Sequence, residues 1–450
     1  MTKNNISQNK RLRFFIKLLV FFVLFIVLHE GILKLSDVSS IKALVQPIFT
    51  YYPVSVRPIF PKPNHGRGES LNLSSSIPKV HLTTSNYGMY SFFNGISALG
   101  INFLMPNEFS RAWWNWNANY HQRGKKWERP ANLKVQDSKG RFLLDENLGI
   151  RINGNTSRAF PQKSFRLCFR NKYGIEQMSS PFNNDEKSEY RTLVLRNLGA
   201  NWGNLYSIDA IIQESIPRKD IIIRAVPVQL LLNDQDWGVY YLRNKIELSV
   251  DEQRQGTKLI KPSTSEYKKL IDNLYVLVSE MDDSLFYSMA NRQLDLESFS
   301  YMIFIHTLFG NKDWPRGNMA VKLSAERKAK FYIKDLDLAF TLELSKGGFK
   351  DLYATNSNVF FELFLKLMRN RQFRNQYMSM VESYFVEDCF ENQLDQYRKR
   401  LSPKTEIQAN RWGRYSIKEI DTYLFSVRDS FEFRKSKYIN GVNAREKLRL

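Results

Sequence analysis

The chain has 450 residues, of which 43% are hydrophobic and 14% aromatic; 66 lysines and arginines against 45 acidic residues give a formal net charge of +21. This length and apolar content suffice for one large core or two ordinary ones, which excludes a mainly disordered chain and a polytopic membrane protein. Two cysteines exclude a disulfide-rich scaffold and a cysteine-based zinc cluster. The positive charge either favours an anionic partner or serves solubility alone.

The amino terminus predicts a single membrane-spanning helix. A basic segment at residues 1–13 precedes an apolar run at residues 14–33, which is just long enough to cross a bilayer. The basic flank favours a cytoplasmic amino terminus and a body outside the inner membrane. The alternative is a cleaved signal peptide, but no small-residue cleavage site follows Leu28 closely. We therefore expect a single-pass cell-membrane protein with the inner membrane as a partner.

Residues 34–80 predict a spacer, because their six prolines fix φ and remove backbone donors. Residues 81–250 then predict a sheet-rich lobe. Apolar stretches recur between residues 130 and 245, separated by Gly, Asn and Asp, and residues 233–236 are typical of a hairpin turn. Between these stretches, apolar residues at 205–216 repeat with a helical period that ends at Pro217. We expect a mainly antiparallel sheet with one inserted helix.

Residues 251–440 predict a helical lobe. The densely apolar residues 299–309 indicate a buried helix that ends at Gly310, with His306 as a packed, hydrogen-bonded core residue. Strands near 319–323 and 331–340 predict a short hairpin. Amphipathic helices are expected over 359–438, followed by a basic tail at 441–450. A sheet-rich lobe followed by a helical lobe is a two-lobed α+β architecture.

Asp313 and Asn318 stand five residues apart on a loop after the predicted buried helix. This spacing matches a kinase catalytic loop, in which the acid orients the attacking hydroxyl and the amide binds Mg²⁺. The alternative is a capping or turn-closing role, which Asp and Asn commonly have in loops.

Asp335 and Asp337 follow the apolar run 331–333. In a strand, alternation places both carboxylates on one face, where they repel each other unless a cation or strong donors lie between them. Mg²⁺ or Mn²⁺ prefers such ligands, with phosphate oxygens completing the coordination. The alternative is an exposed acidic strand edge, but the flanking apolar residues indicate burial and favour a metal.

A loop of small residues at 153–157 joins two predicted strands, and Lys163 opens the second. Such a loop lets backbone N–H groups and hydroxyls approach phosphates, and Lys163 is placed to reach them. Arg151, Arg158 and Arg166 add positive charge nearby. A simple turn with surface arginines is the alternative, and the residues alone favour it.

Trp113, Trp114 and Trp116 form an aromatic cluster with Tyr120. Such a cluster suits a sugar or base platform, but we favour packing at the start of the sheet.

The order of these segments resembles the spore coat protein H (CotH) kinase family, from about residue 110 to residue 438. The similar segments are residues 127–131, 148–158, 161–167, 195–197, 209–210, 232–240, 310–318 and 335–337. The resemblance implies an atypical protein-kinase-like fold with an antiparallel sheet-rich N-lobe and a helical C-lobe. It also implies transfer of the ATP γ-phosphate to a hydroxyl of a protein Ser/Thr or a surface glycan, with Mg²⁺ or Mn²⁺.

The resemblance implies roles for single residues at the catalytic loop and the metal. Asp313 resembles the acid that positions the acceptor hydroxyl, and Asn318 resembles the metal-binding amide. Asp335 resembles the metal-binding acid, which Asp337 supports or replaces.

For the nucleotide, Lys163 resembles the strand lysine that grips phosphates, and Glu214 on the inserted helix is its candidate partner. Arg151 adds charge, and residues 242–247 lie at the hinge beside the adenine. The residues that resemble the phosphate-covering loop are Asn155, Thr156 and Ser157.

Two departures leave alternatives open. Lys334 stands where the family usually has Trp, and a lysine there competes with a metal for the carboxylates. ATP is scarce outside the inner membrane, so another phosphate donor, or an inactive kinase-like scaffold that binds an anionic surface polymer, is an alternative. A glycosyltransferase that holds Mn²⁺ through Asp335 and Asp337 is a further one, although alternating parallel strands and helices are missing. No nucleic acid is expected, because the basic residues are dispersed.

Overall fold

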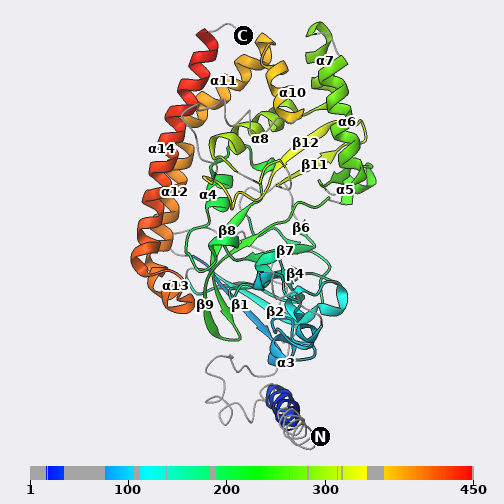
Figure 1. The fold of residues 1–450 in the computed structure, drawn as a ribbon, viewed down its shortest axis with the longest axis vertical. Helices are drawn as coiled ribbons and strands as arrows, with labels where there is room; N and C mark the ends of the chain where they lie inside the picture. Colours follow the sequence, from blue (N-terminus) through cyan, green and yellow to red (C-terminus); the bar gives the residue numbers. More distant parts are fainter. Residues whose placement is uncertain are drawn as a thin grey trace, which may run out of the picture.

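The computed structural model describes residues 17, 19–34, 77–105, 112–137, 139–182, 189–248, 250–262, 264–280, 283–311, 313–315, 318–341 and 359–447. The basic segment predicted at residues 1–13, most of the spacer predicted at 34–80 and the last three residues of the predicted basic tail lie outside these residues. The described chain is a mixed α+β protein with a sheet-rich part followed by a mostly helical part (Figure 1).

The sheet-rich part is built on a closed barrel of strands. Neighbouring strands pair antiparallel, except that β1 pairs with β8 in parallel and so closes the ring. In barrel order the strands are β1 (Lys79–Thr84), β2 (Arg129–Gln136), β3 (Phe142–Asn153), β4 (Ser164–Cys168), β7 (Thr192–Arg196), β9 (Gln235–Arg243) and β8 (Ala225–Leu232). The predicted antiparallel sheet is therefore present, and it is rolled into a barrel.

Two local predictions in this part are confirmed. The hairpin between β8 and β9 turns at Asn233 and Asp234, whose φ angles of 51° and 65° are both positive, as a two-residue hairpin turn requires. The inserted helix is α4 (Ile208–Ser215), which begins where the Ser207 side chain accepts a hydrogen bond from the backbone N of Ala210 and ends before Pro217.

Short elements complete the sheet-rich part. They are α3 (Asn86–Tyr90), β5 (Met178–Ser179), β6 (Glu189–Tyr190), and the 3-10 turns η3 (Ile101–Leu104), η4 (Trp113–Asn115), η5 (Asn119–His121), η6 (Lys125–Trp127), η7 (Thr156–Arg158), η8 (Gly199–Asn201) and η9 (Lys219–Ile221).

The second part surrounds a small antiparallel sheet with helices. The sheet strands are β10 (Lys258–Ile260), β11 (Met319–Leu323) and β12 (Ala329–Ile333). The helices are α5 (Val250–Arg254), α6 (Ser265–Glu280), α7 (Asp283–Gln293), α8 (Leu296–Leu308), α10 (Val359–Leu367), α11 (Arg371–Val386), α12 (Cys389–Leu401), α13 (Thr405–Trp412) and α14 (Ile417–Lys447), with the 3-10 turn η10 (Ser402–Lys404).

The predicted buried helix and hairpin are found here, with one difference. Helix α8 is buried and its C-cap is Phe309, followed by Gly310 at φ 55°. The second hairpin strand, β12, ends at Ile333 and does not continue to residue 340. Positive φ angles at Asp335 (57°) and Phe340 (64°) are incompatible with a strand and turn the chain away.

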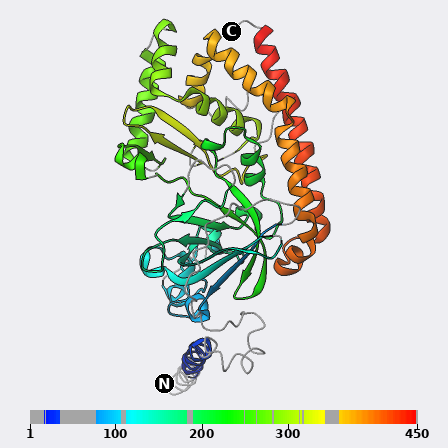
Figure 2. The ribbon, with the colours of Figure 1, turned by 180° about the vertical axis from the view of Figure 1, so that it is seen from behind.

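Each part has its own apolar core. Phe165 and Leu242 belong to the barrel core, and Phe304 and Phe331 belong to the helical core. Helix α4 packs into the helical core although it is inserted between barrel strands, so it connects the two parts. Helices α12 and α14 run side by side along one flank, from the helical part down to the barrel (Figures 1 and 2).

The prediction of a membrane-spanning anchor at residues 14–33, and of a place in the cell membrane, is wrong. None of the helices that the structure describes is both long and apolar enough to span a bilayer. The described helix over residues 19–34 ends against the folded body, beside α3 (Figure 1). There Leu33 is buried, and the Glu30 carboxylate accepts hydrogen bonds from the Ser91 hydroxyl and the Phe92 backbone N–H.

Candidate active site

Asp335 and Asp337 meet at one arginine where the barrel faces the helical part. Arg196, the last residue of β7, donates from Nη2 to Asp335 Oδ1 at 2.9 Å and also to Asp337 Oδ2. The two carboxylates are not brought together by strand alternation, because β12 ends before them and Asp335 has a left-handed backbone. The group between the two carboxylates is the guanidinium of Arg196, whereas the sequence favoured a metal ion there.

A second ion pair fixes residues 335–337, which we call the acidic segment. Arg243, at the end of β9, donates to Asp209 Oδ2 at 2.8 Å, and both side chains are buried. The other oxygen of Asp209 accepts from the backbone N of Leu336 at 2.9 Å. Asp209 lies in the first turn of α4, so helix and barrel together fix the position of the acidic segment.

The charges in this network are unequal: three carboxylates face two guanidinium groups. For Arg196, burial lowers the pKa, but the charges of Asp337 and Asp335 outweigh burial and hold the pKa well above its usual value. For Asp335, burial alone favours a higher pKa, but Arg196 and Arg243 outweigh burial and lower it. Burial raises the pKa of Asp337 to about 7, and the neighbouring carboxylates of Asp335 and Asp209 add to that rise.

Gly199 allows the chain to pass close to this network. Its φ of +57° belongs to the left-handed region, and a Cβ at this position would lie 1.9 Å from Asp337 Oδ2. A larger residue therefore has no room beside the carboxylate.

The predicted catalytic loop follows α8 and is tied to the acidic segment through Asn311. The Asn311 side-chain amide donates to the backbone O of Asp335 at 3.1 Å and to His306 Nδ1 at 3.2 Å. Asn311 Oδ1 accepts from the backbone N of Asp313 at 3.3 Å. Asp313 is exposed, and Asn318 is half-buried immediately before β11. The prediction for His306 is confirmed, because its ring is buried, bonded to Asn311 and, in addition, stacked on Trp314.

The carboxylates fit a metal that arrives with phosphate oxygens. Mg²⁺ commonly takes one or two protein carboxylates and fills its other positions with water and phosphate. Among the residues that the structure describes, no three His, Cys, Asp or Glu side chains gather as a metal cluster. Asp335 and Asp337 are therefore candidate ligands for a metal that fills its other positions with water and phosphate oxygens, and in this structure both accept from Arg196.

The hydrogen bonds of Lys163 are made within its own loop and not to the acidic segment. Lys163 is buried, and its Nζ donates to the backbone O of Ala159 at 3.0 Å and of Phe160 at 2.8 Å. Nζ also lies 4.2 Å from the ring centroid of Tyr120, and burial lowers the pKa of this lysine to about 7. Lys163 therefore supports the shape of the loop between β3 and β4.

The other predicted nucleotide ligands are also dispersed. Glu214 pairs with Arg224 at 3.1 Å and with Lys219 at 3.6 Å. Arg151 on β3 lies 3.5 Å from Glu128. Asn155 accepts from Arg123 at 3.1 Å, while Thr156 and Ser157 form the start of η7.

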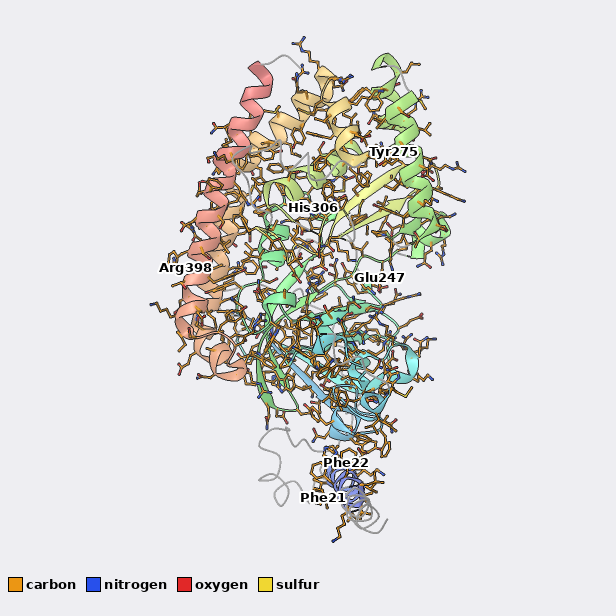
Figure 3. The ribbon with its side chains drawn as sticks, in the orientation of Figure 1. Phe21, Phe22, Glu247, Tyr275, His306 and Arg398 are labelled. Atoms are coloured by element: carbon orange, nitrogen blue, oxygen red, sulfur yellow. The ribbon has the colours of Figure 1, made fainter. Side chains whose placement is uncertain are left out.

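Four further cations converge beside the acidic segment. Arg166 on β4 lies 3.8 Å from Glu247, which follows β9 where the barrel meets the helical part (Figure 3). Burial lowers the pKa of Lys245 to about 8, and the charges of Arg166, Lys261 and Lys334 add to that effect. A pocket of about 350 Å³ opens at this edge of the barrel, lined by Arg166, Cys168, Phe169, Arg170, Asn171, Glu176, Arg191, Thr192 and Glu247.

Arg196 and Asp209 lie in segments of family resemblance but were given no individual role from the sequence, and Arg243 was placed only in the hinge segment 242–247. A signal was present in the sequence: Arg196 ends an apolar strand, and Asp209 stands in the first turn of the next helix. A strand cation followed by an acid on the inserted helix is also the pattern that pointed to Lys163 and Glu214.

Comparison with known proteins identifies the family of the chain. The family model described as "CotH kinase protein" matches residues 150–267 and 251–445. The matched residues include the acidic segment, the loop after α8 and all three newly identified charged residues. No curated protein matches the chain.

Proposed function

Because the chain belongs to the CotH kinase protein family, we propose that it transfers the γ-phosphate of ATP to a hydroxyl of a protein Ser/Thr or a glycan, with the two-lobed fold of an atypical protein kinase. The observation that carries this proposal is that Asn311 ties the loop of Asp313 to the backbone of Asp335, between the two parts of the molecule. Phosphoryl transfer needs positioned cations and carboxylates more than covalent chemistry.

In this proposal the acidic segment holds the metal. Asp335 and Asp337 are the carboxylate ligands, and Asn318 supplies an amide oxygen. A bound Mg²⁺ or Mn²⁺ neutralises charge on the phosphate oxygens. Asn311 keeps the Asp335 backbone in place, and Asp209 does the same for Leu336.

In this proposal Arg196, and not Lys163, is the strand cation that binds the phosphates. It is the cation that touches the acidic segment, and it ends the strand that precedes α4. Asp209 on α4 then corresponds to the acid that stabilises this region, through Arg243. Lys245, Lys261 and Lys334 add positive charge for the remaining phosphates.

Asp313 positions the acceptor. Its exposure and its place on the loop tied to Asp335 leave the carboxylate open to an incoming hydroxyl. It accepts the hydroxyl proton as the new phosphate bond forms.

The test uses the full chain with ATP and either Mg²⁺ or Mn²⁺, and measures labelled phosphate transfer and nucleotide binding. Asp313→Asn is expected to reduce transfer by about a hundredfold or more and to retain nucleotide binding. The control is Asp395→Asn, an exposed acid on α12 paired with Arg428, which is expected to transfer at the wild-type rate. Undiminished transfer in Asp313→Asn refutes the assignment.

A second comparison separates the two candidate cations. Arg196→Met is expected to abolish metal-dependent nucleotide binding. Lys163→Met is expected to weaken nucleotide binding less, and only by disturbing the loop between β3 and β4. The reverse result restores the phosphate role to Lys163.

An inactive kinase-like scaffold is the second candidate, and one observation favours it. Arg196 occupies both carboxylates, and Lys334 stands next to Asp335, so cations already lie where a metal is expected. Nucleotide binding that is independent of metal, without transfer, supports this candidate. Nothing favours a sugar-nucleotide transferase, because the described strands before Asp335 pair antiparallel except for β1 with β8.

A further inference from the structure

A row of aromatic rings lies on the surface beside the loop between β3 and β4. Trp113 and Trp114 form η4, and 42% and 38% of their surfaces are exposed, so they are not packed into the sheet as expected. The Trp113 ring centroid lies 5.6 Å from that of Trp114 and 6.2 Å from that of Phe160. Phe160 stacks on Trp202 with centroids 6.0 Å apart. We call these four rings the aromatic platform.

The aromatic platform adjoins the candidate active site. Trp202 follows Gly199, whose backbone passes directly beside Asp337. Phe160 belongs to the same loop as Gln162, and Gln162 Oε1 accepts from the backbone N of Gly203 at 2.8 Å. The two segments that carry the inner rings are therefore fixed to each other. A long ligand lying on the exposed rings extends along the platform toward the acidic segment.

The surroundings of the aromatic platform are positively charged. Arg158 is buried beneath the loop and donates to the backbone O of Gly154 and of Tyr120. Burial lowers the pKa of Arg158 to about 10, and the nearby cations Arg123, Arg151 and Arg166 add to that effect. At the other end, Arg414 lies over the Trp202 ring at 4.7 Å. This field attracts a ligand with negative charge.

The geometry favours an acidic glycan over an acidic peptide or a nucleic acid. The exposed indole rings of Trp113 and Trp114, at 78° to each other on a surface turn, offer apolar contacts to the C–H faces of pyranose rings, whereas apolar peptide side chains need a pocket to enter. A nucleic acid needs direct Lys or Arg contacts to its phosphates. The guanidinium of Arg158 and the ammonium of Lys163 are instead buried and committed to backbone carbonyls.

We infer that the aromatic platform binds an acidic glycan, and that this glycan presents the hydroxyl to be phosphorylated. The second clause rests on the proposed function. The sugar hydroxyl oxygen forms the new bond to the γ-phosphorus, and the bond from that phosphorus to the β–γ bridging oxygen breaks. ADP leaves with the bridging oxygen, and the hydroxyl proton passes to the Asp313 carboxylate.

The test is affinity electrophoresis of the full chain in gels that contain polygalacturonate, with neutral dextran in parallel gels. Wild type is expected to be retarded by polygalacturonate and not by dextran. Trp113→Ala combined with Trp114→Ala is expected to weaken binding by about tenfold or more, because two ring contacts are lost. Tyr275→Ala is the matched control, since it removes an aromatic ring that is 45% exposed on α6, in the helical part of the molecule (Figure 3).

Equal retardation of wild type and the double tryptophan variant overturns the inference, and so does the absence of retardation by polygalacturonate. Tighter binding of poly-glutamate or oligo-dT through the same tryptophans also overturns it, in favour of an acidic peptide or a single-stranded nucleic acid. Because the gels contain no nucleotide, a failure of phosphoryl transfer refutes the proposed function and leaves glycan binding standing. A wild-type protein that transfers phosphate but is not retarded by polygalacturonate refutes the glycan inference and leaves the proposed function standing.

Discussion

His306 joins the helical core to the acidic segment, and its neutral form is required there. The Asn311 amide N–H₂ group can only donate, so His306 Nδ1 must accept, which a protonated imidazole cannot do. The same amide donates to the backbone O of Asp335. Burial lowers the pKa of His306 to about 3. Acid is therefore expected to destabilise the fold through this residue.

The sign and size follow from proton linkage. The pKa of 6.5 in the unfolded chain exceeds the value of about 3 in the folded chain, so the unfolded state binds more protons as the pH falls below 6.5. The stabilising contribution is complete above pH 6.5 and is lost progressively toward pH 3. Between about pH 7.5 and about pH 5, the loss amounts to about 2 kcal/mol.

The assay is urea denaturation of the wild type and of His306→Gln at these two pH values. Glutamine keeps an oxygen that accepts from Asn311 and does not titrate. Wild type is expected to lose about 2 kcal/mol more than His306→Gln between the two conditions. The matched control is His81→Gln, on β1, which also removes one histidine and is expected to keep the wild-type difference. Identical pH dependence in wild type and His306→Gln refutes the reasoning.

Two further predictions concern the charged network itself. Gly199→Ala forces a Cβ against Asp337 and is expected to destabilise the fold by about 2 kcal/mol more than Gly256→Ala, where φ is also positive but no atom lies within 4 Å; equal thermal shifts for both variants contradict this. Arg243→Met leaves Asp209 buried without its guanidinium and is expected to lose about 3 kcal/mol in urea denaturation. Adding Asp209→Asn is expected to restore part of that loss, and a double variant as unstable as the sum of both single variants argues against the pairing.

Local chemistry explains which elements the sequence predicts well. The turn at Asn233 and Asp234 follows from residues that tolerate positive φ. Helix α4 follows from its apolar period and the cap at Ser207. Neither prediction depends on distant parts of the chain.

Closure of the barrel and the partners of the charged residues depend on distant contacts. Strand β1 pairs with β8, about 150 residues later, and no local pattern encodes that choice. Arg196 likewise meets carboxylates 139 and 141 residues away. From the sequence alone, Lys163 is as good a candidate as Arg196 for the phosphate-binding cation, because both residues stand at the ends of barrel strands. What separates them is that Lys163 turns back into its own loop.

The same contacts connect the acidic segment to both parts of the molecule. From the barrel side, Arg196 holds its carboxylates, and from the connecting helix α4, Asp209 accepts from the backbone N of Leu336. From the helical side, Asn311 holds the backbone O of Asp335. When the barrel and the helical part move relative to each other, the acidic segment can keep its contacts with only one of them and loses those with the other. Under the proposed function, a nucleotide bound at this segment would stabilise one relative position of the two parts, and its binding energy would align Asp313 with the acceptor.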